Sequence, residues 1–100
     1  MRQRYQSELK RRISYILSFK SSDPRVKGVC VRDVVLSKDM RFAKVYVSVL
    51  DDAKADDALY ALDAAEGFIR KNLSSDMPWR FAPNLEFVLY KELDFGNGKN

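Results

Sequence analysis

The side chains that most often carry out catalysis are scarce in this chain of 100 residues. It contains no histidine and a single cysteine, Cys30, so it lacks the commonest general base and the commonest zinc ligand. Ser-His-Asp triads, Cys-His nucleophile pairs and Cys/His zinc sites are therefore excluded. Neither G-x-x-x-x-G-K-S/T nor G-x-G-x-x-G occurs, so no nucleotide-binding signature is present. An enzyme would have to work with Asp, Glu, Lys, Arg and Tyr alone, so composition favours a non-enzymatic protein without catalytic residues, cofactor, metal or small-molecule substrate. A small α+β enzyme or protein-interaction domain is the alternative. Cys30 is expected in the core.

Carboxylates are concentrated in one block, where Asp51, Asp52, Asp56 and Asp57 lie within seven residues. Such a block is compatible with a divalent-cation site or with the start of a helix. It lacks the spacing and the bidentate glutamate of an EF-hand loop. Acidic side chains cap the free N–H groups of a first helical turn and complement the helix dipole. The block therefore favours a helix start.

Basic side chains are concentrated in the first part of the chain. Residues 1–44 hold 12 Lys and Arg against 4 Asp and Glu, a net charge of +8, and residues 45–100 hold 6 against 10, a net charge of −4. This asymmetry is typical of a protein that turns one face toward a polyanion, although a solvated surface with uneven charge gives the same count. The candidate contacts are Arg4, Lys10, Arg11, Arg12, Arg25, Lys27, Arg32, Arg41, Lys44, Arg70, Lys71 and Arg80.

Several of these cations have a second interpretation. The consecutive cations at positions 10–12 are also compatible with a solvated helix face. Arg25 follows Pro24 in a stiff turn, where it either presents its guanidinium fork to a phosphate or pairs with Asp23. Arg70 either extends the basic surface or neutralises the end of a helix.

The first cations are positioned by a predicted helix over residues 2–19. Its apolar positions recur with a period of about 3.6 residues and form one stripe. The stripe consists of Tyr5, Leu9, Ile13, Ile16 and Leu17. At about 100° per residue, Arg4 and Arg11 point nearly opposite the stripe, and Lys10 and Arg12 flank it. The Ser-Ser-Asp-Pro segment that follows ends the helix, because proline cannot continue it.

Two strands are predicted next, over residues 29–37 and 41–50, and they form an antiparallel hairpin because only three residues separate them. A helical pattern then runs from the carboxylate block to residue 73. Gly67 interrupts this pattern at a cost of about 1 kcal/mol relative to alanine. We therefore expect two helices, with Gly67 in a backbone conformation that a β-branched residue cannot adopt. The last strand, over residues 84–90, should run parallel to one hairpin strand, because a helical crossover leads to it.

The predicted order is α-β-β-α-kink-α-β. It favours an α+β fold with the helices packed on one face of a three-stranded mixed sheet. We expect one domain over residues 1–94 and a disordered tail over 95–100. No segment approaches the roughly 18 apolar residues of a membrane span, and a single cysteine fits a reducing compartment. These features favour a soluble cytoplasmic protein, which we expect to be monomeric.

Several segments match a known family in its own order. They are the amphipathic helix running into Asp23-Pro24-Arg25, the hairpin segments Val34–Asp39 and Ala43–Leu50, the segment Ala65–Arg70, and Arg80–Phe87. With these segments in register over nearly the whole chain, the sequence resembles bacterial ribosome-binding factor A.

The resemblance implies a KH-like fold of the second topological type. Ordinary KH domains clamp single-stranded nucleic acid with a GXXG loop, and no GXXG occurs in this chain. The family has an Ala-x-Gly helix kink instead, which Ala65 and Gly67 match. We therefore expect the basic side chains to contact folded ribosomal RNA. Tyr46, Trp79 and Phe81 are candidates for stacking on bases, with core packing as the alternative.

The resemblance also implies a function. Members of the family are small-subunit assembly factors that bind the free 30S subunit and 16S rRNA. They support late maturation and processing of 16S rRNA at its 5′ end, including during growth in the cold. The alternative is a general KH-like RNA-binding module without ribosome specificity.

Overall fold

The structure, a computed structural model, describes residues 2–76 and 82–91. The helices and strands follow one another in the order α1 (Arg2–Tyr15), β1 (Val29–Leu36), β2 (Phe42–Val49), α2 (Ala55–Ala64), α3 (Glu66–Asp76) and β3 (Asn84–Leu89). A π-helical turn (Ile16–Lys20) extends α1, and short 3-10 turns (Pro24–Val26 and Asp52–Lys54) precede β1 and α2. The predicted element order is confirmed. The expected tail at residues 95–100 lies outside the described residues.

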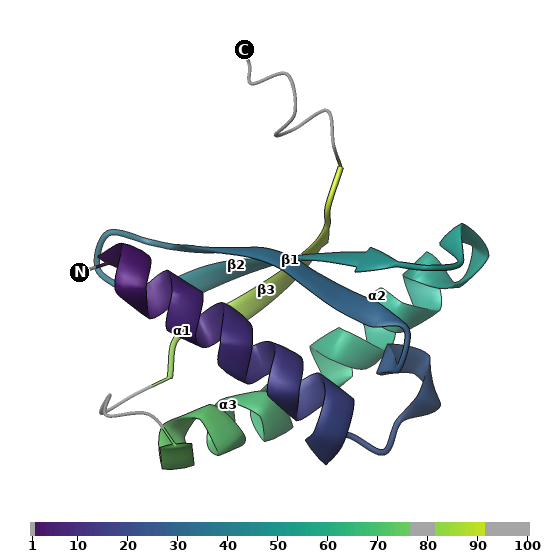
Figure 1. Cartoon of the computed structure of the whole chain (residues 1–100), viewed down its shortest axis with the longest axis horizontal. Coiled ribbons are helices and arrows are strands. Elements are labelled where there is room, and N and C mark those ends of the chain that lie inside the picture. Colours follow the sequence, from purple (N-terminus) through teal and green to yellow (C-terminus); the bar gives the residue numbers. More distant parts are fainter. Residues whose placement is uncertain (1, 77–81, 92–100) are drawn as a thin grey trace.

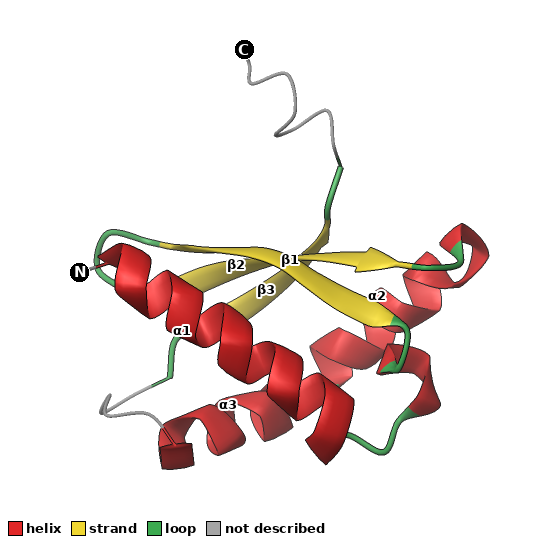
Figure 2. Ribbon diagram, in the orientation of Figure 1, coloured by secondary structure: helices red, strands yellow, loops and turns green. Residues whose placement is uncertain are grey.

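The elements form two layers, with the three helices on one side of the sheet (Figures 1 and 2). The strand order is β1-β2-β3, with β1 antiparallel and β3 parallel to β2. The mixed sheet and the parallel last strand are therefore confirmed, and β2 is the central strand. Within the described residues, no helix is long and apolar enough to cross a membrane.

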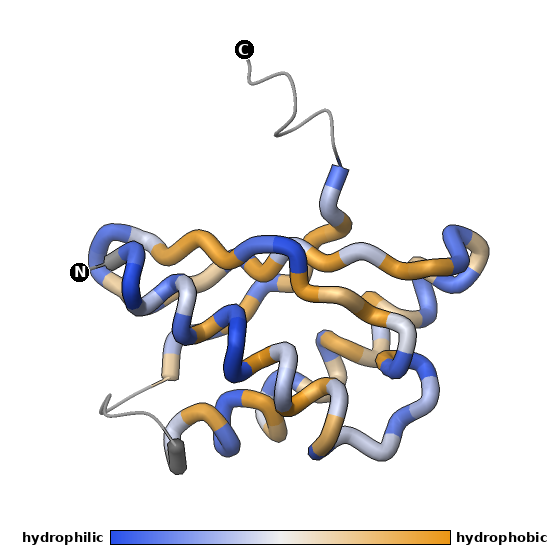
Figure 3. Tube along the Cα trace, viewed as in Figure 1, coloured by the Kyte–Doolittle hydropathy of each residue, from blue (hydrophilic) through white to orange (hydrophobic). Residues whose placement is uncertain are grey.

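The core lies between the two layers. The inward positions of β2 are Ala43, Val45 and Val47, all of which are buried. Four of the five stripe residues of the first helix are buried in the same core, and Tyr5 packs at the margin. From α2 and α3 the buried residues are Ala58, Ala61, Leu62, Ile69 and Leu73. The hydrophobic segments of both layers are orange in Figure 3. The period-based predictions of the inward faces are thus confirmed.

A bulge in β1 places Cys30 outside the core. Val31 pairs with Val47 and Asp33 with Tyr46, so the register shifts at Arg32. Such a bulge adds one residue to one strand. Val31 and Val34 are both buried, and Cys30, which precedes Val31, points to the opposite face and is exposed. The expectation that Cys30 is a core residue is wrong. Unbroken alternation from the buried Val34 would turn Cys30 inward, and the extra residue of the bulge turns it outward.

Side chains from two helices reach the outer strands of the sheet. The backbone N–H of Leu36 in β1 donates to Oε1 of Gln6 at 2.9 Å. The backbone N–H of Leu85 in β3 donates to Oε2 of Glu66 at 2.8 Å. These bonds connect α1 to β1 and α3 to β3, and so fix the orientation of both helices relative to the sheet.

The helical segment after the hairpin is broken at Ala65. The backbone of Ala65 has φ −91° and ψ 0°, and its N–H closes the end of α2. The Ala65 carbonyl accepts from the Ile69 N–H at 2.9 Å, which begins α3. The expected division into two helices is confirmed. Gly67 lies inside α3 with φ outside the left-handed region, so the expected special backbone conformation of Gly67 is wrong.

Replacing Gly67 with alanine should therefore stabilise the fold, by up to about 1 kcal/mol. A Cβ atom at this position would meet no atom within 4 Å apart from its chain neighbours and the backbone of its own helix, and alanine loses less backbone entropy than glycine on forming a helix. Urea unfolding of the variant and the parent chain measures the difference. A loss of more than 1 kcal/mol would contradict the helical conformation of Gly67.

Candidate nucleic-acid interface

The solvent side of α1 carries the largest group of predicted contacts. Arg4, Lys10 and Arg11 are exposed, and Arg12 is half-buried. Glu8 lies among them and forms ion pairs with Nη2 of Arg11 and Nε of Arg12, each at 2.6 Å. The hydrogen bond from Arg11, together with that from Arg12, lowers the pKa of Glu8 below its usual value. Glu8 is thus ionised at neutral pH, and its carboxylate orients the two guanidinium groups that donate to it.

Two exposed aromatic rings lie on the same helix, and the sequence analysis missed them. Tyr15 and Phe19 are 53% and 74% exposed, and their ring centroids are 5.1 Å apart with an interplanar angle of 42°. Arg11, Tyr15 and Phe19 are spaced four residues apart, which places neighbours on one side of a helix. The four-residue spacing is present in the sequence. These residues lie outside the apolar stripe, and only the stripe was used to predict which side of the helix is functional or buried.

The turn between β1 and β2 places Arg41 toward the start of α1. The Gln6–Leu36 bond holds the end of β1 beside the first turns of this helix (Figure 1). The carboxylate of Asp39 accepts from Oγ of Ser37 at 2.7 Å and from the Arg41 N–H at 3.1 Å. The bond from Ser37 is the main cause of a lowered pKa of Asp39. Arg41 itself is exposed, so this end of the molecule presents it together with Arg4.

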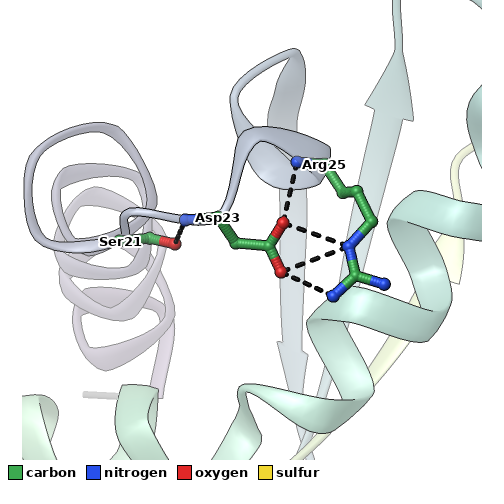
Figure 4. Close-up of polar contacts among 3 residues, drawn as sticks. All are labelled: Ser21, Asp23 and Arg25. Atoms are coloured by element: carbon green, nitrogen blue, oxygen red, sulfur yellow. Dashed lines mark hydrogen bonds and ion pairs between the residues drawn. The ribbon is translucent and has the colours of Figure 1, made fainter.

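At the opposite end of α1, Arg25 is held by an acidic partner. Its Nη2 and Nε lie 2.8 and 3.1 Å from the two carboxylate oxygens of Asp23, and its backbone N–H also donates to that group (Figure 4). These bonds lower the pKa of Asp23. The guanidinium carbon also lies 5.9 Å from the ring centroid of Tyr60. Of the two interpretations left open, pairing with Asp23 is the one observed. Lys27 is exposed nearby.

Two further cations lie on the open face of the sheet, away from the helices. Arg32 reaches across this face, with its guanidinium carbon 4.5 Å from the ring centroid of Tyr90. Lys44 is exposed on β2, next to the half-buried Tyr46. The sheet separates these side chains from α1, so the predicted contacts do not form a single surface.

Of the two cations on α3, Arg70 makes hydrogen bonds within the fold and Lys71 is exposed. Nε of Arg70 donates to the Pro83 carbonyl at 3.1 Å, and Nη2 donates to the Ala82 carbonyl at 3.2 Å. Both acceptors belong to buried residues that lead into β3. Lys71 is exposed. Arg80, Trp79 and Phe81 lie outside the described residues. Arg70 therefore holds the start of β3 against α3 rather than extending a basic surface.

Substituting Arg70 with methionine should destabilise the fold by about 1–3 kcal/mol, because it leaves two carbonyls beside a buried segment without their donor. Thermal unfolding measures the loss. Lys10→Met, which removes an exposed cation from another helix, is the control and should change stability by less than about 0.5 kcal/mol. Equal stability of the two variants would show that the Arg70 bonds contribute nothing.

The carboxylate block begins the next helix, as predicted. The Asp51 side chain accepts from the Ala53 N–H at 3.0 Å, and Asp56 and Asp57 lie in the first turn of α2. In the part of the chain that the structure describes, no group of three or more Cys, Asp or Glu side chains is placed to hold a metal ion. Within the block, Asp51 caps the 3-10 turn that leads into α2, and Asp56 and Asp57 complement the positive end of the α2 dipole without capping it.

The comparisons with known proteins agree on one family. A family model for ribosome-binding factor A matches residues 1–98. The chain belongs to the ribosome-binding factor A family. It is 38% identical over 94 residues to ribosome-binding factor A of Francisella philomiragia. That alignment covers 94% of this chain and 66% of the relative, so the chain spans just under two thirds of the relative's length.

Solved structures of the family share the fold. A crystal structure of ribosome-binding factor A from Thermus thermophilus superposes with a TM-score of 0.80 at 30% identity, over 89% of this chain and 96% of that one. A homology model of the Thermus thermophilus factor, fitted into a cryo-EM map of its complex with the 30S subunit, has a TM-score of 0.69 at 28% identity. It covers 94% of this chain and 93% of that one. The predicted α+β fold, with helices packed on a three-stranded mixed sheet, is confirmed.

Proposed function

We propose that this chain is a non-enzymatic assembly factor that binds the free 30S subunit and 16S rRNA. It supports late maturation and 5′-end processing of 16S rRNA, including during growth in the cold. The observation that carries the proposal is membership of a family in which a relative has been placed on the 30S subunit. The protein acts in the cytoplasm as a monomer, with residues 1–94 as one domain, and needs no cofactor or small-molecule substrate.

The basic side of α1 supports a binding mode based on phosphates. Arg4, Lys10 and Arg11 project from one rigid element, and Arg41 and Lys27 lie toward its two ends. Such contacts position a protein on RNA without reading its sequence. The chain has no GXXG loop to clamp a single strand. The surface therefore suits folded rRNA, whose phosphates have fixed positions.

Sucrose-gradient sedimentation of a cell lysate tests the proposal directly. A small-subunit assembly factor should migrate with free 30S subunits and be depleted from 70S ribosomes. A general KH-like RNA-binding module, the alternative function, should spread over all fractions that contain RNA. Migration at the top of the gradient would contradict both.

A matched pair of double variants tests the role of α1. Arg4 and Lys10 are the choice because each is exposed and no ion pair of either is seen among the described residues. Arg4→Gln with Lys10→Gln should leave thermal unfolding nearly unchanged. It should weaken 30S binding and make the dependence of log K on log salt shallower by about 1.4–1.8.

The control is Lys54→Gln with Lys91→Gln, which removes the same charge from exposed positions outside the predicted set. It should bind 30S subunits as the parent chain does. If both double variants weaken binding to 30S subunits by the same factor, net charge rather than the α1 surface determines binding.

A further inference from the structure

Tyr15, the last residue of α1, and Phe19, in the π-helical turn that follows, form an aromatic pair that is exposed in spite of its size. More than half of the surface of Phe19 and of Tyr15 is exposed to water, although burial of apolar surface stabilises a fold. The π-helical turn that contains Phe19 is closed by the Ser21 N–H, which donates to the Ile16 carbonyl at 3.0 Å. This turn buries Ile16 and Leu17 and leaves Phe19 outside. The two rings lie against each other rather than against the core.

A hollow beside Tyr15 has two cations in its lining. It measures about 170 Å³ and is bounded by Arg11, Arg12, Tyr15 and Ile16. This volume is below the roughly 300–1,000 Å³ of pockets that enclose small ligands, so a ligand would contact this surface without being enclosed by it. The ion pairs with Glu8 hold both guanidinium groups at the rim. The site therefore combines a flat apolar surface with fixed positive charge.

Aromatic rings next to cations are the elements with which proteins bind unpaired nucleotides. A base stacks on the ring, and the cations attract the adjoining phosphates, without preference for a particular base. We propose that Tyr15 and Phe19 form a stacking platform for an unpaired base of the RNA, with Arg11 and Arg12 contacting its backbone. The inference rests on the proposed function and specifies what α1 binds.

Charge favours RNA over a protein as the occupant. Residues 2–20 contain six Lys and Arg and a single acidic residue, Glu8. Glu8 is already paired with two of these cations. A protein partner would have to be strongly acidic around an apolar contact, whereas RNA supplies phosphates next to every base.

Three substitutions of Phe19 separate stacking from simple apolar contact. Phe19→Ala should weaken binding to protein-free 16S rRNA and to 30S subunits by about 5- to 150-fold, as expected for the loss of one stacked base. Phe19→Leu, which keeps an apolar side chain without a ring, should also weaken binding. Phe19→Trp, which keeps an aromatic ring, should bind as the parent chain does. Phe68→Ala, at a ring that is 45% exposed on α3, is the control and should bind as the parent chain does.

Each outcome distinguishes this inference from the proposed function. If the parent chain binds 30S subunits and all Phe19 variants bind equally well, the platform is wrong and the function stands. If Phe19→Leu binds as the parent chain does while Phe19→Ala binds less, or if the loss appears on 30S subunits but not on protein-free rRNA, the occupant is a protein. If the parent chain does not bind 30S subunits at all, the proposed function itself fails.

Discussion

Raising the salt concentration from about 50 to 200 mM should weaken binding of this chain to free 30S subunits by about 60- to 1,000-fold. Each neutralised phosphate releases counterions and contributes a slope of roughly −0.7 to −0.9 in log K against log salt. If about four to six basic side chains engage phosphates, the total slope is about −3 to −5 by the same rule. The exposed cations of α1 and of the two ends of this helix supply that number.

Binding titrations with labelled protein at four or five salt concentrations measure this slope. Short single-stranded oligonucleotides should bind weakly and with little sequence preference, since phosphate contacts do not distinguish bases. A slope near zero, or tight and selective binding to one short single strand, would contradict a phosphate-based mode and favour the general KH-like module.

Truncating Leu9 to alanine should cost about 2–5 kcal/mol of folding free energy. Leu9 is fully buried in the apolar stripe of α1, and its loss leaves a cavity that a close-packed core fills only partly. Domains of this size are stable by about 5–15 kcal/mol in total, so one substitution removes a large share. Urea denaturation with circular dichroism measures the change.

Leu50→Ala is the matched control, because it makes the same chemical change at a side chain that is 96% exposed. It should alter stability by no more than about 0.5 kcal/mol. A loss below 1 kcal/mol for Leu9→Ala would mean that α1 is not packed on the sheet as described, and the basic surface would then have no fixed geometry.

The fold could be predicted from the sequence where one residue period dominates. The alternation in β2 and the stripe of α1 gave the inward faces directly, because burial of one face requires that spacing. The neighbour of β3 could not be predicted, since pairing with β1 or β2 satisfies the same local pattern. The position of Cys30 was predicted wrongly because a bulge shifts the alternation of β1, and the sequence pattern does not show where that bulge lies. The break falls at Ala65, the first residue of the Ala-x-Gly kink that the resemblance implied, whereas composition alone pointed to Gly67, two residues later.

The sequence allowed us to predict which cations of the candidate interface are exposed, but not which groups the other cations contact. The exposure of Arg4, Lys10 and Arg11 follows from their angle to the apolar stripe. The role of Arg70 does not, because its acceptors lie 12 and 13 residues further along the chain, beyond the end of its own helix. Pairing of Arg25 with Asp23 was one of two local alternatives, and only the geometry separates them.

The bonds from Gln6 and Glu66 to the outer strands also limit how other molecules can approach the sheet. An edge strand with free N–H and C=O groups is a template for a strand from another chain, and many proteins recognise peptides in this way or aggregate through it. Here a helix side chain already occupies one backbone N–H on each outer strand. A partner strand that paired with Leu36 or Leu85 would have to break the bond at that residue. The two bonds therefore disfavour strand addition at the end of β1 and at the start of β3.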